Sequence, residues 1–512
     1  GRKLAAQQYF DKVLKESGSL LDRLRVFEFK IALLSSNGQY SEAVGLGLQA
    51  LKRAGYSLSG RSTSINKVLR NSLDNKERLL KLYKKRRDQK PSEEDRLLAR
   101  IFAQTITPAF LTKSERLPFL VHSLLEMSEK KGPFPETSVG LVVLGALACE
   151  HLSDYQEGSQ AGKLAQELVE RFNARDLRGR INYYYLSSIH CWTEPLAGRL
   201  PLYQRAMDQC LETGDLPFAG LCIFEMLSQK LIYCNDSLPD LESLFQSYQI
   251  PIGRIGQDWA LEMFGMLRQS LHNLQGASRQ KTSLKGDFFD DTAMEKRWKN
   301  AEAHRSLFYL NLYKSFLAVL FGNQTTVKNS KYRGPLSHYD SVFARYVAAI
   351  EQIANAKSAD ARKAWMQQCE ETLEVLKGLE KNCPANFAPL KTHLEAELLW
   401  KKNELTAAMT AFDQACRSSE RYGPAILSGF IRQRTAGLYL AMEKPVFARI
   451  YADQARSIYE TLKSHAQIEH TDRLLDEIRH QHLALFEQDS EKASKETRLP
   501  AVADHPRTPS SY

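Results

Sequence analysis

Small residues recur at helical spacing in two consecutive series between residues 394 and 459. Each member of the second series stands 40 positions after its counterpart, and the series are Ala396, Leu399, Glu404, Leu405, Ala408, Phe412 and Ala415, then Ala436, Tyr439, Lys444, Pro445, Ala448, Ala452 and Ala455. Small side chains three to four residues apart allow paired helices to approach closely, while bulkier residues fill the space between hairpins. The pattern therefore predicts two stacked helical hairpins, and it carries no chemistry of its own.

Two earlier segments show the same pattern in a weaker form. They contain Ile31, Leu34, Gly38, Tyr40, Ala43, Gly47 and Ala50, and then Ala146, Cys149, Asp154, Tyr155, Gly158, Gly162 and Ala165. The sequence lacks sustained polar–apolar alternation between hairpin turns, which strands would require. We therefore predict an all-α fold, a degenerate tetratricopeptide-like array of helical hairpins (an α-solenoid) with roughly 20 to 25 helices and a disordered C-terminal tail.

Interruptions of the helical pattern suggest a division of the chain into six parts. Ser92 with the acidic residues after it is typical of a capping box, which marks a fresh helix start, and Gly334-Pro335 marks a loop. The predicted parts are N-terminal hairpins at 1–60 that start within a repeat, a basic connecting segment at 61–91, a central hairpin array at 92–321, a loop at 322–338, a C-terminal hairpin array at 339–486 and a disordered tail at 487–512.

Composition excludes several classes of protein. The longest nearly uninterrupted apolar run, Val139 to Cys149, covers 11 residues, whereas a membrane-spanning helix needs about 20. The eight cysteines form no Cys-x-x-Cys pair and have no histidine at zinc-finger spacing, so we expect reduced, mostly buried thiols and no metal site. The first residues contain no apolar signal core, and together these features predict a cytoplasmic protein.

Most of the net charge of +10 is concentrated in one segment. Between Arg61 and Lys90 the chain has 11 basic and three acidic residues, an excess of +8. A run such as Lys84, Lys85, Arg86, Arg87 could contact nucleic acid or an anionic surface. The alternative interpretation, which we favour because aromatic residues are not interleaved, is a solvated helix end or loop.

Candidate sites for chemistry are few, and each has a structural alternative. The segment from Gly158 to Lys163 departs from the phosphate-loop pattern and lies in a predicted helix, and His480 and His482 lie on different faces of a helix. The residues Tyr183, Tyr184, Tyr185, His190, Trp192 and Phe224 could line a ligand groove, but aromatic stripes at this spacing favour a helical core.

The acidic loop at 286–291 is assigned to helix initiation, with Thr292 and Glu295 as a capping box. We therefore predict no catalytic, cofactor-binding or metal-binding residues, and we assign no partner-binding residue.

Four segments together resemble one region of a known family. They are 23–56 with its Gly38-Gln39-Tyr40 turn, Cys191-Trp192-Thr193-Glu194-Pro195-Leu196, the loop 282–290, and Asn382-Cys383-Pro384-Ala385-Asn386-Phe387 leading into Leu394-Glu395-Ala396-Glu397. The chain up to about Leu475 is similar to the long tetratricopeptide-like region of large multidomain signalling proteins. Those proteins carry a serine/threonine kinase-like domain, an AAA/STAND-type ATPase and often GAF and histidine-kinase domains.

The resemblance implies a non-catalytic scaffold or sensor region of a signal-transduction ATPase or kinase. Such a region would bind protein segments or neighbouring domains of the same polypeptide, or a small effector, without a cofactor. Two alternatives stay open: a free-standing adaptor that binds peptides, and, less favoured, a binder of nucleic acid or anionic surfaces through Arg61 to Lys90.

Overall fold

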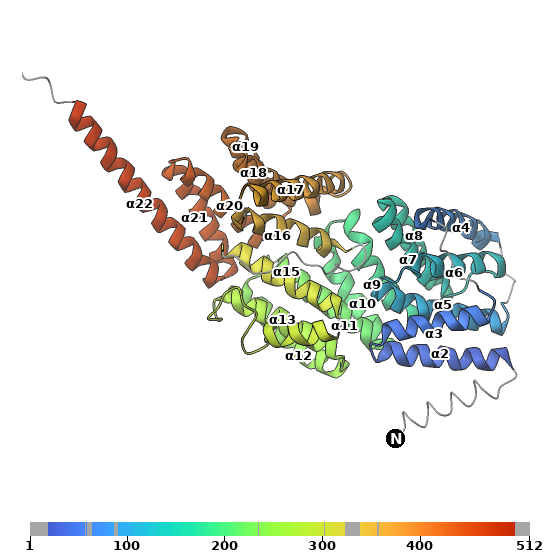
Figure 1. Ribbon diagram of the computed structural model, residues 1–512. Coiled ribbons are helices and arrows are strands. Elements are labelled where there is room, and N and C mark those ends of the chain that lie inside the picture. Colours follow the sequence, from blue (N-terminus) through green and yellow to red (C-terminus); the bar gives the residue numbers. More distant parts are fainter. Residues whose placement is uncertain are drawn as a thin grey trace, which may run out of the picture.

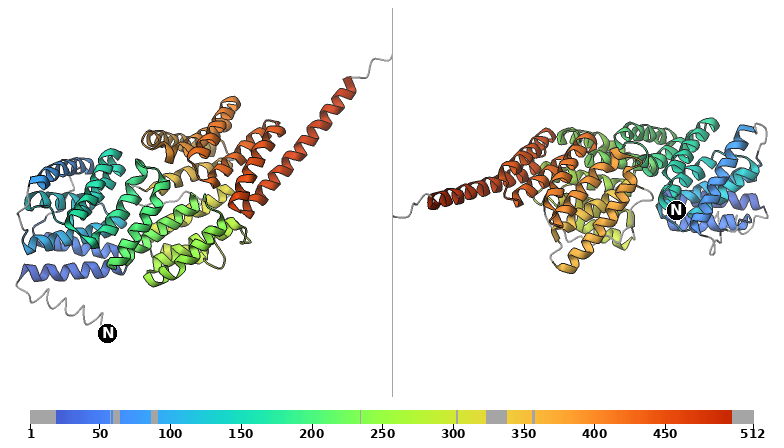
Figure 2. Two further views of the ribbon diagram at one scale, coloured as in Figure 1. Left: turned by 180° about the vertical axis from the view of Figure 1, so that it is seen from behind. Right: turned by 90° about the horizontal axis from the view of Figure 1, so that it is seen from above.

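The computed structural model describes residues 19–56, 58, 64–85, 91–233, 235–301, 303–322, 338–355 and 358–496. These residues form 21 α-helices and no strand, apart from one isolated bridge between Lys285 and Asp290. The all-α prediction is confirmed. Consecutive helices pack side by side along an elongated array, from α2 at one end to α22, which projects beyond the body at the other (Figure 1; Figure 2).

The helices fall into three sections along the chain. The first section comprises α2 (Leu20–Ser36), α3 (Tyr40–Arg53), α4 (Ile65–Lys85), α5 (Glu93–Leu111), α6 (Leu117–Lys131), α7 (Thr137–Leu147), α8 (Tyr155–Phe172), α9 (Arg175–Ser188), α10 (Arg199–Thr213) and α11 (Leu216–Ile232). The middle section comprises α12 (Leu238–Ile255), α13 (Asp258–Gln275), α14 (Asp291–Asn300) and α15 (His304–Leu320). The last section comprises α16 (Tyr339–Asn355), α17 (Ala359–Glu380), α18 (Pro384–Lys401), α19 (Leu405–Tyr422), α20 (Ala425–Ala441), α21 (Pro445–Leu462) and α22 (His465–Glu496).

The turns inside the four predicted repeat units share one backbone conformation. Gly38, Ser153, Asn403 and Glu443 each stand five residues before the first small residue of the second helix, and each has a left-handed φ, of 74°, 52°, 62° and 57° respectively. Residues other than glycine seldom adopt this conformation, because their Cβ crowds the backbone. The coincidence at four equivalent positions supports the alignment of the units.

Close helix contact at the small residues is confirmed. In the last two units Ala396, Ala408, Ala436, Ala448 and Ala452 are fully buried. They lie in small apolar clusters in which Phe412 and Leu438 fill one interface, and Tyr439 and Ile478 the next.

The α7–α8 pair shows how tight such a contact is. A Cβ atom added at Gly158 would lie 2.4 Å from the Cys149 sulfur and 2.8 Å from the Gly145 carbonyl oxygen. The two helix backbones therefore touch at this glycine, as the small-residue pattern predicts.

The last section also contacts earlier hairpins end-on, through the N-terminal ends of its helices. The Asn386 side chain, near the start of α18, donates to the carbonyl oxygens of Cys191 (2.7 Å) and Glu194 (2.9 Å) and accepts from the Leu196 amide (2.9 Å). The amide of Ala425 at the start of α20 donates to Asn235, and the Ser464 hydroxyl before α22 donates to the Leu274 carbonyl oxygen. These contacts join residues about 190 positions apart in the sequence, so the array is not connected through consecutive hairpins alone.

Gly158→Ala should lower stability, because overpacking a close helix contact costs about 1–3 kcal/mol, more than the helix propensity that alanine gains. Gly378→Ala is the matched control, since nothing lies within 4 Å of a Cβ added there and Gly378 is exposed on α17. We expect this control to raise the free energy of unfolding by about 0.5–1 kcal/mol. Urea unfolding of both variants measures the difference, and an unchanged midpoint for Gly158→Ala would contradict backbone contact here.

Asn386→Ala should lower stability by about 3 kcal/mol, because it leaves buried backbone groups at 191–196 without partners. The half-buried side chain of Asn382 makes one bond, to the Gly378 carbonyl oxygen within the same turn, so Asn382→Ala should change the stability by less than about 0.5 kcal/mol. Amide hydrogen exchange at 191–196 should accelerate only in the first variant. Equal exchange in both would show that Asn386 does not hold the end-on contact.

Candidate functional site

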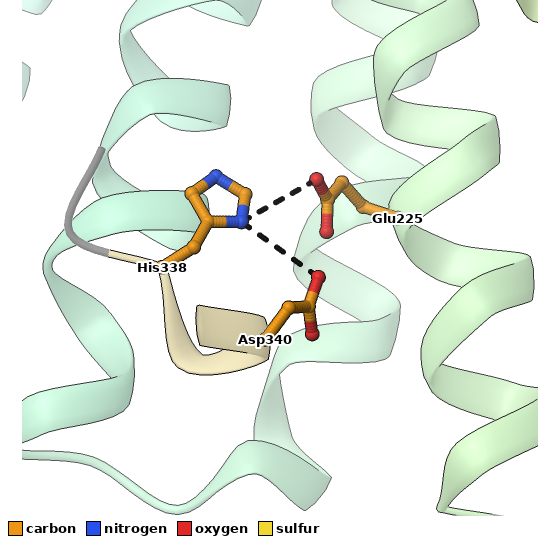
Figure 3. A group of neighbouring side chains, drawn as sticks. All are labelled: Glu225, His338 and Asp340. Atoms are coloured by element: carbon orange, nitrogen blue, oxygen red, sulfur yellow. Dashed lines mark ion pairs between the residues drawn. The ribbon is translucent and has the colours of Figure 1, made fainter. Parts of the chain in front are cut away.

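A buried cluster of one histidine and two carboxylates lies where α11 meets the start of α16. It consists of Glu225, His338 and Asp340, whose side chains converge on one point (Figure 3). His338 Nδ1 lies 3.7 Å from Glu225 Oε1 and 3.9 Å from Asp340 Oδ2, and all three atoms lie within 4.8 Å of one another. Each residue is at most 4% exposed.

Local structure explains how the sequence places these groups. Glu225 interrupts the apolar run of α11, a helix that is buried over most of its length, so its carboxylate has no route to solvent. His338 directly precedes α16, and its carbonyl oxygen accepts from the Ser341 amide in the first turn. Asp340 lies in that first turn, where the helix dipole favours negative charge.

Three further residues surround the cluster. The Tyr309 hydroxyl donates to Asp340 Oδ2 (3.1 Å). Arg305 Nη2 lies 3.5 Å from Glu225 Oε1, but it donates to the Tyr183 hydroxyl and its guanidinium sits 5.0 Å from the centre of the Trp259 ring.

Arg199 supplies a second guanidinium nearby. It is buried and donates to the Leu186 carbonyl oxygen (2.9 Å). Two arginine cations thus lie beside the two carboxylates in the interior, but their guanidinium groups donate the hydrogen bonds described to residues outside the cluster.

Burial and charge shift the pKa values of the two carboxyl groups in opposite directions. Burial raises the pKa of Glu225, and the neighbouring Asp340 adds to the rise. Although burial opposes ionisation of Asp340 as well, the hydrogen bond and charge of His338, followed by the charge of Arg199, lower its pKa overall. The cluster therefore combines one carboxyl group that burial keeps closer to the protonated form with one that His338 keeps ionised.

A second buried carboxylate, in the C-terminal section, has a different environment. Both oxygens of Glu397 accept from Arg434, at 2.5 and 2.9 Å, and His393 lies on its other side with Nε2 at 3.4 Å. The Tyr346 hydroxyl bonds His393 Nδ1 at 2.7 Å. Glu397 is thus neutralised by a bidentate partner, and this network fixes α16, α18 and α20 to one another.

An open, polar pocket of about 510 Å³ lies at the junction between the C-terminal section and residue 235. Its lining comprises Asn235, Ser419, Glu420, Gly423, Ala425, Ser428, Arg432, Gln454, Ser457 and Ile458. Arg432 is buried in the wall, where its guanidinium lies 3.3 Å from both Glu420 and Gln454. Arg432 also donates to Ser428, so its guanidinium is bonded on several sides within the wall of the pocket.

The aromatic residues singled out in the sequence are core residues. Tyr183, Tyr184, Tyr185, His190, Trp192 and Phe224 are all buried, and Trp192 stacks on Phe387 at 6.0 Å between ring centres. Their burial agrees with the core interpretation. The segment Gly158–Lys163 lies inside α8, as predicted.

The acidic loop before α14 does start a helix, but the cap was assigned to the wrong residue. Asp290, and not Thr292, is the N-cap, and its Oδ1 accepts from the amides of Thr292 and Ala293 at 3.0 Å. Aspartate is at least as favourable as threonine at the N-cap position. The helix therefore begins two residues earlier than the Thr-x-x-Glu pattern predicts. Ser92 caps α5 as predicted.

The basic segment contains a helix with inward-facing polar groups. Lys76 of α4 is buried and pairs with Glu157 of α8 at 2.5 Å, and Arg78 pairs with Glu129 of α6 at 2.7 Å. Arg61, Arg86, Arg87 and Lys90 lie outside the described residues, as does Cys234, whereas the seven described cysteines are buried and free. Lys76 is therefore packed between helices, whereas the Arg78–Glu129 pair links α4 to α6 at the surface.

The Glu225–His338–Asp340 cluster was missed by sequence reasoning, because 113 residues separate Glu225 from His338. The only sequence signal was a glutamate inside an apolar helical run. No family model matches the chain, and no curated protein was found to match it. Among the described residues, none of the helices combines the length and the apolar character that crossing a membrane requires.

The buried histidines predict a loss of stability in mild acid. Burial, followed by the charges of Arg199 and Lys163, lowers the pKa of His190 to about 4, from an ordinary value of 6.5. Between pH 6.5 and pH 4 the unfolded chain therefore binds a proton at this histidine, and the folded chain does not. As the pH falls through this range, the free energy of unfolding decreases by up to about 1.4 kcal/mol per pH unit.

His190→Gln should reduce this pH dependence, whereas exchange of the exposed His482 should not. Urea midpoints at several pH values between 7 and 4.5 measure the slopes. An identical slope in His190→Gln and the parent chain would contradict the assignment, whatever the absolute stability of the variant.

Proposed function

We propose that the chain is a non-catalytic helical-repeat scaffold that binds a protein segment or a neighbouring domain of the same polypeptide. The observation that carries this proposal is a set of exposed apolar side chains on the last two helices. Large apolar side chains about half exposed or more project from them, namely Val446, Phe447 and Ile450 on α21 and Leu483 and Phe486 on α22. Exposed apolar side chains of this size are common at protein interaction sites, so they support a protein partner.

The resemblance to signalling proteins supports a more specific form of this proposal. The chain would be the sensor or scaffold arm of an ATPase or kinase whose catalytic domains lie outside these 512 residues. The polar pocket at Arg432 supports a second, compatible role in binding a small effector, because it lies where α20 meets the earlier hairpins. An effector there would contact both sections.

The alternatives make different predictions about the gene. A phosphate-loop ATPase encoded in frame before Gly1 supports the signalling arm, and a start codon directly ahead supports a free-standing adaptor. Binding to nucleic acid that falls steeply with salt and with replacement of Lys84, Lys85, Arg86 and Arg87 would support the third alternative. Turnover of ATP by the purified chain would contradict a non-catalytic role.

The double variant Phe447→Ser, Ile450→Ser should weaken binding to the separately expressed flanking domains at least tenfold. Each change removes an apolar side chain worth about 1–2 kcal/mol when buried in an interface. Isothermal titration calorimetry measures the affinity, and circular dichroism checks that the variant is folded, because Phe447 also stacks on Tyr439.

Leu261→Ser is the matched control, since Leu261 is 41% exposed near the start of α13, whereas α13 is bonded to the start of α22 through Leu274 at its other end. Equal affinity of the double variant and this control would show that α21 does not form the binding surface.

A further inference from the structure

We propose that Glu225, His338 and Asp340 bind a divalent transition-metal ion of the Zn²⁺ or Mn²⁺ class. One imidazole nitrogen and two carboxylate oxygens form a donor set that suits these ions. The site would join α11 to the first turn of α16 and so link the first and last sections of the chain.

The distances are close to those of a coordination site. Ligands about 2.1 Å from one ion lie roughly 3.0–3.5 Å apart. His338 Nδ1 lies 3.7 and 3.9 Å from the two carboxylate oxygens, so each ligand needs to move inward by only a few tenths of an ångström. Such shifts are within the range of side-chain rotation.

Glu225 Oε1 provides independent support. It is buried without a hydrogen-bond partner, and it faces His338 Nδ1. Burial of an acceptor without a hydrogen-bond partner destabilises the folded state by about 1–3 kcal/mol. A bound cation would satisfy it, and the Tyr309 hydroxyl on Asp340 would then orient the ligand from outside, as second-layer groups do at metal sites.

The two guanidiniums oppose the ion, and this opposition can be tested. Arg305 is the nearer of the two at 3.5 Å from Glu225 Oε1, and its hydrogen bond and ring contact hold it towards Tyr183 and Trp259 instead of the cluster. Like charges at such a distance repel strongly in a buried site. The parent chain should therefore bind the metal more weakly than a closed structural site, and removal of the Arg305 charge should strengthen binding.

The experiment uses the full chain, stripped with chelator and titrated with Zn²⁺ alone and with Mn²⁺ alone. Equilibrium dialysis with elemental analysis gives stoichiometry and affinity, and the thermal midpoint should rise with the ion concentration, because only the folded chain assembles the site. We expect one ion per chain, and a loss of affinity of at least tenfold in His338→Gln and in Asp340→Asn. Arg305→Gln should bind several-fold more tightly.

Controls separate this site from adventitious binding. A double variant of the exposed His480 and His482 should retain the site, and circular dichroism reports whether each ligand variant is folded. If His338→Gln does not fold, Asp340→Asn and Arg305→Gln still decide the question. Absence of binding in the parent chain, binding that persists in the ligand variants, or weaker binding in Arg305→Gln would each overturn the proposal and leave a plain ion-pair cluster.

Discussion

Backbone contact between paired helices is the constraint on which this structure depends. At Gly158 and Gly145 the helices α7 and α8 touch, and alanines at equivalent positions bring α18 to α19 and α20 to α21 almost as close. Close pairs require a short turn that reverses the chain at once, which explains why Gly38, Ser153, Asn403 and Glu443 adopt a left-handed conformation. Small side chains and left-handed turns thus occur together in these four units.

The end-on contacts change how such an array can move. In a simple solenoid each hairpin touches only its neighbours, so curvature can change by small additive steps. Here Asn386 ties the start of α18 to residues 191–196, and Ser464 ties the start of α22 to α13. A change of curvature in the last section would have to break buried hydrogen bonds, so coupling between the sections should be discrete and not gradual.

The sequence was sufficient for the parts of the fold that repeat. Spacing at 394–459 identified two hairpins because every small residue had a counterpart 40 positions later, and Ser92 identified a helix start because a cap is a local interaction. Asp290 was harder, since Asp290 and Thr292 could both cap α14 and only the path of the chain decided between them. Asn386, Glu225 and His338 could not be placed, because their roles depend on partners more than 100 residues away, and no local pattern encodes those contacts.

Two buried glutamates differ in their hydrogen-bond partners, which the sequence alone does not reveal. Glu397 carries a full set of partners: Arg434 binds both of its oxygens, and the guanidinium and imidazole around it lower its pKa despite complete burial. Glu225 is buried to the same degree, yet one oxygen has no hydrogen-bond partner and burial raises its pKa. A scaffold that needs only rigidity is served by the first arrangement, since breaking or leaving open a buried ion pair costs several kcal/mol. The second arrangement leaves one buried carboxylate oxygen without a hydrogen-bond partner, and a bound cation would satisfy it. We therefore expect binding and folding to be coupled at this cluster.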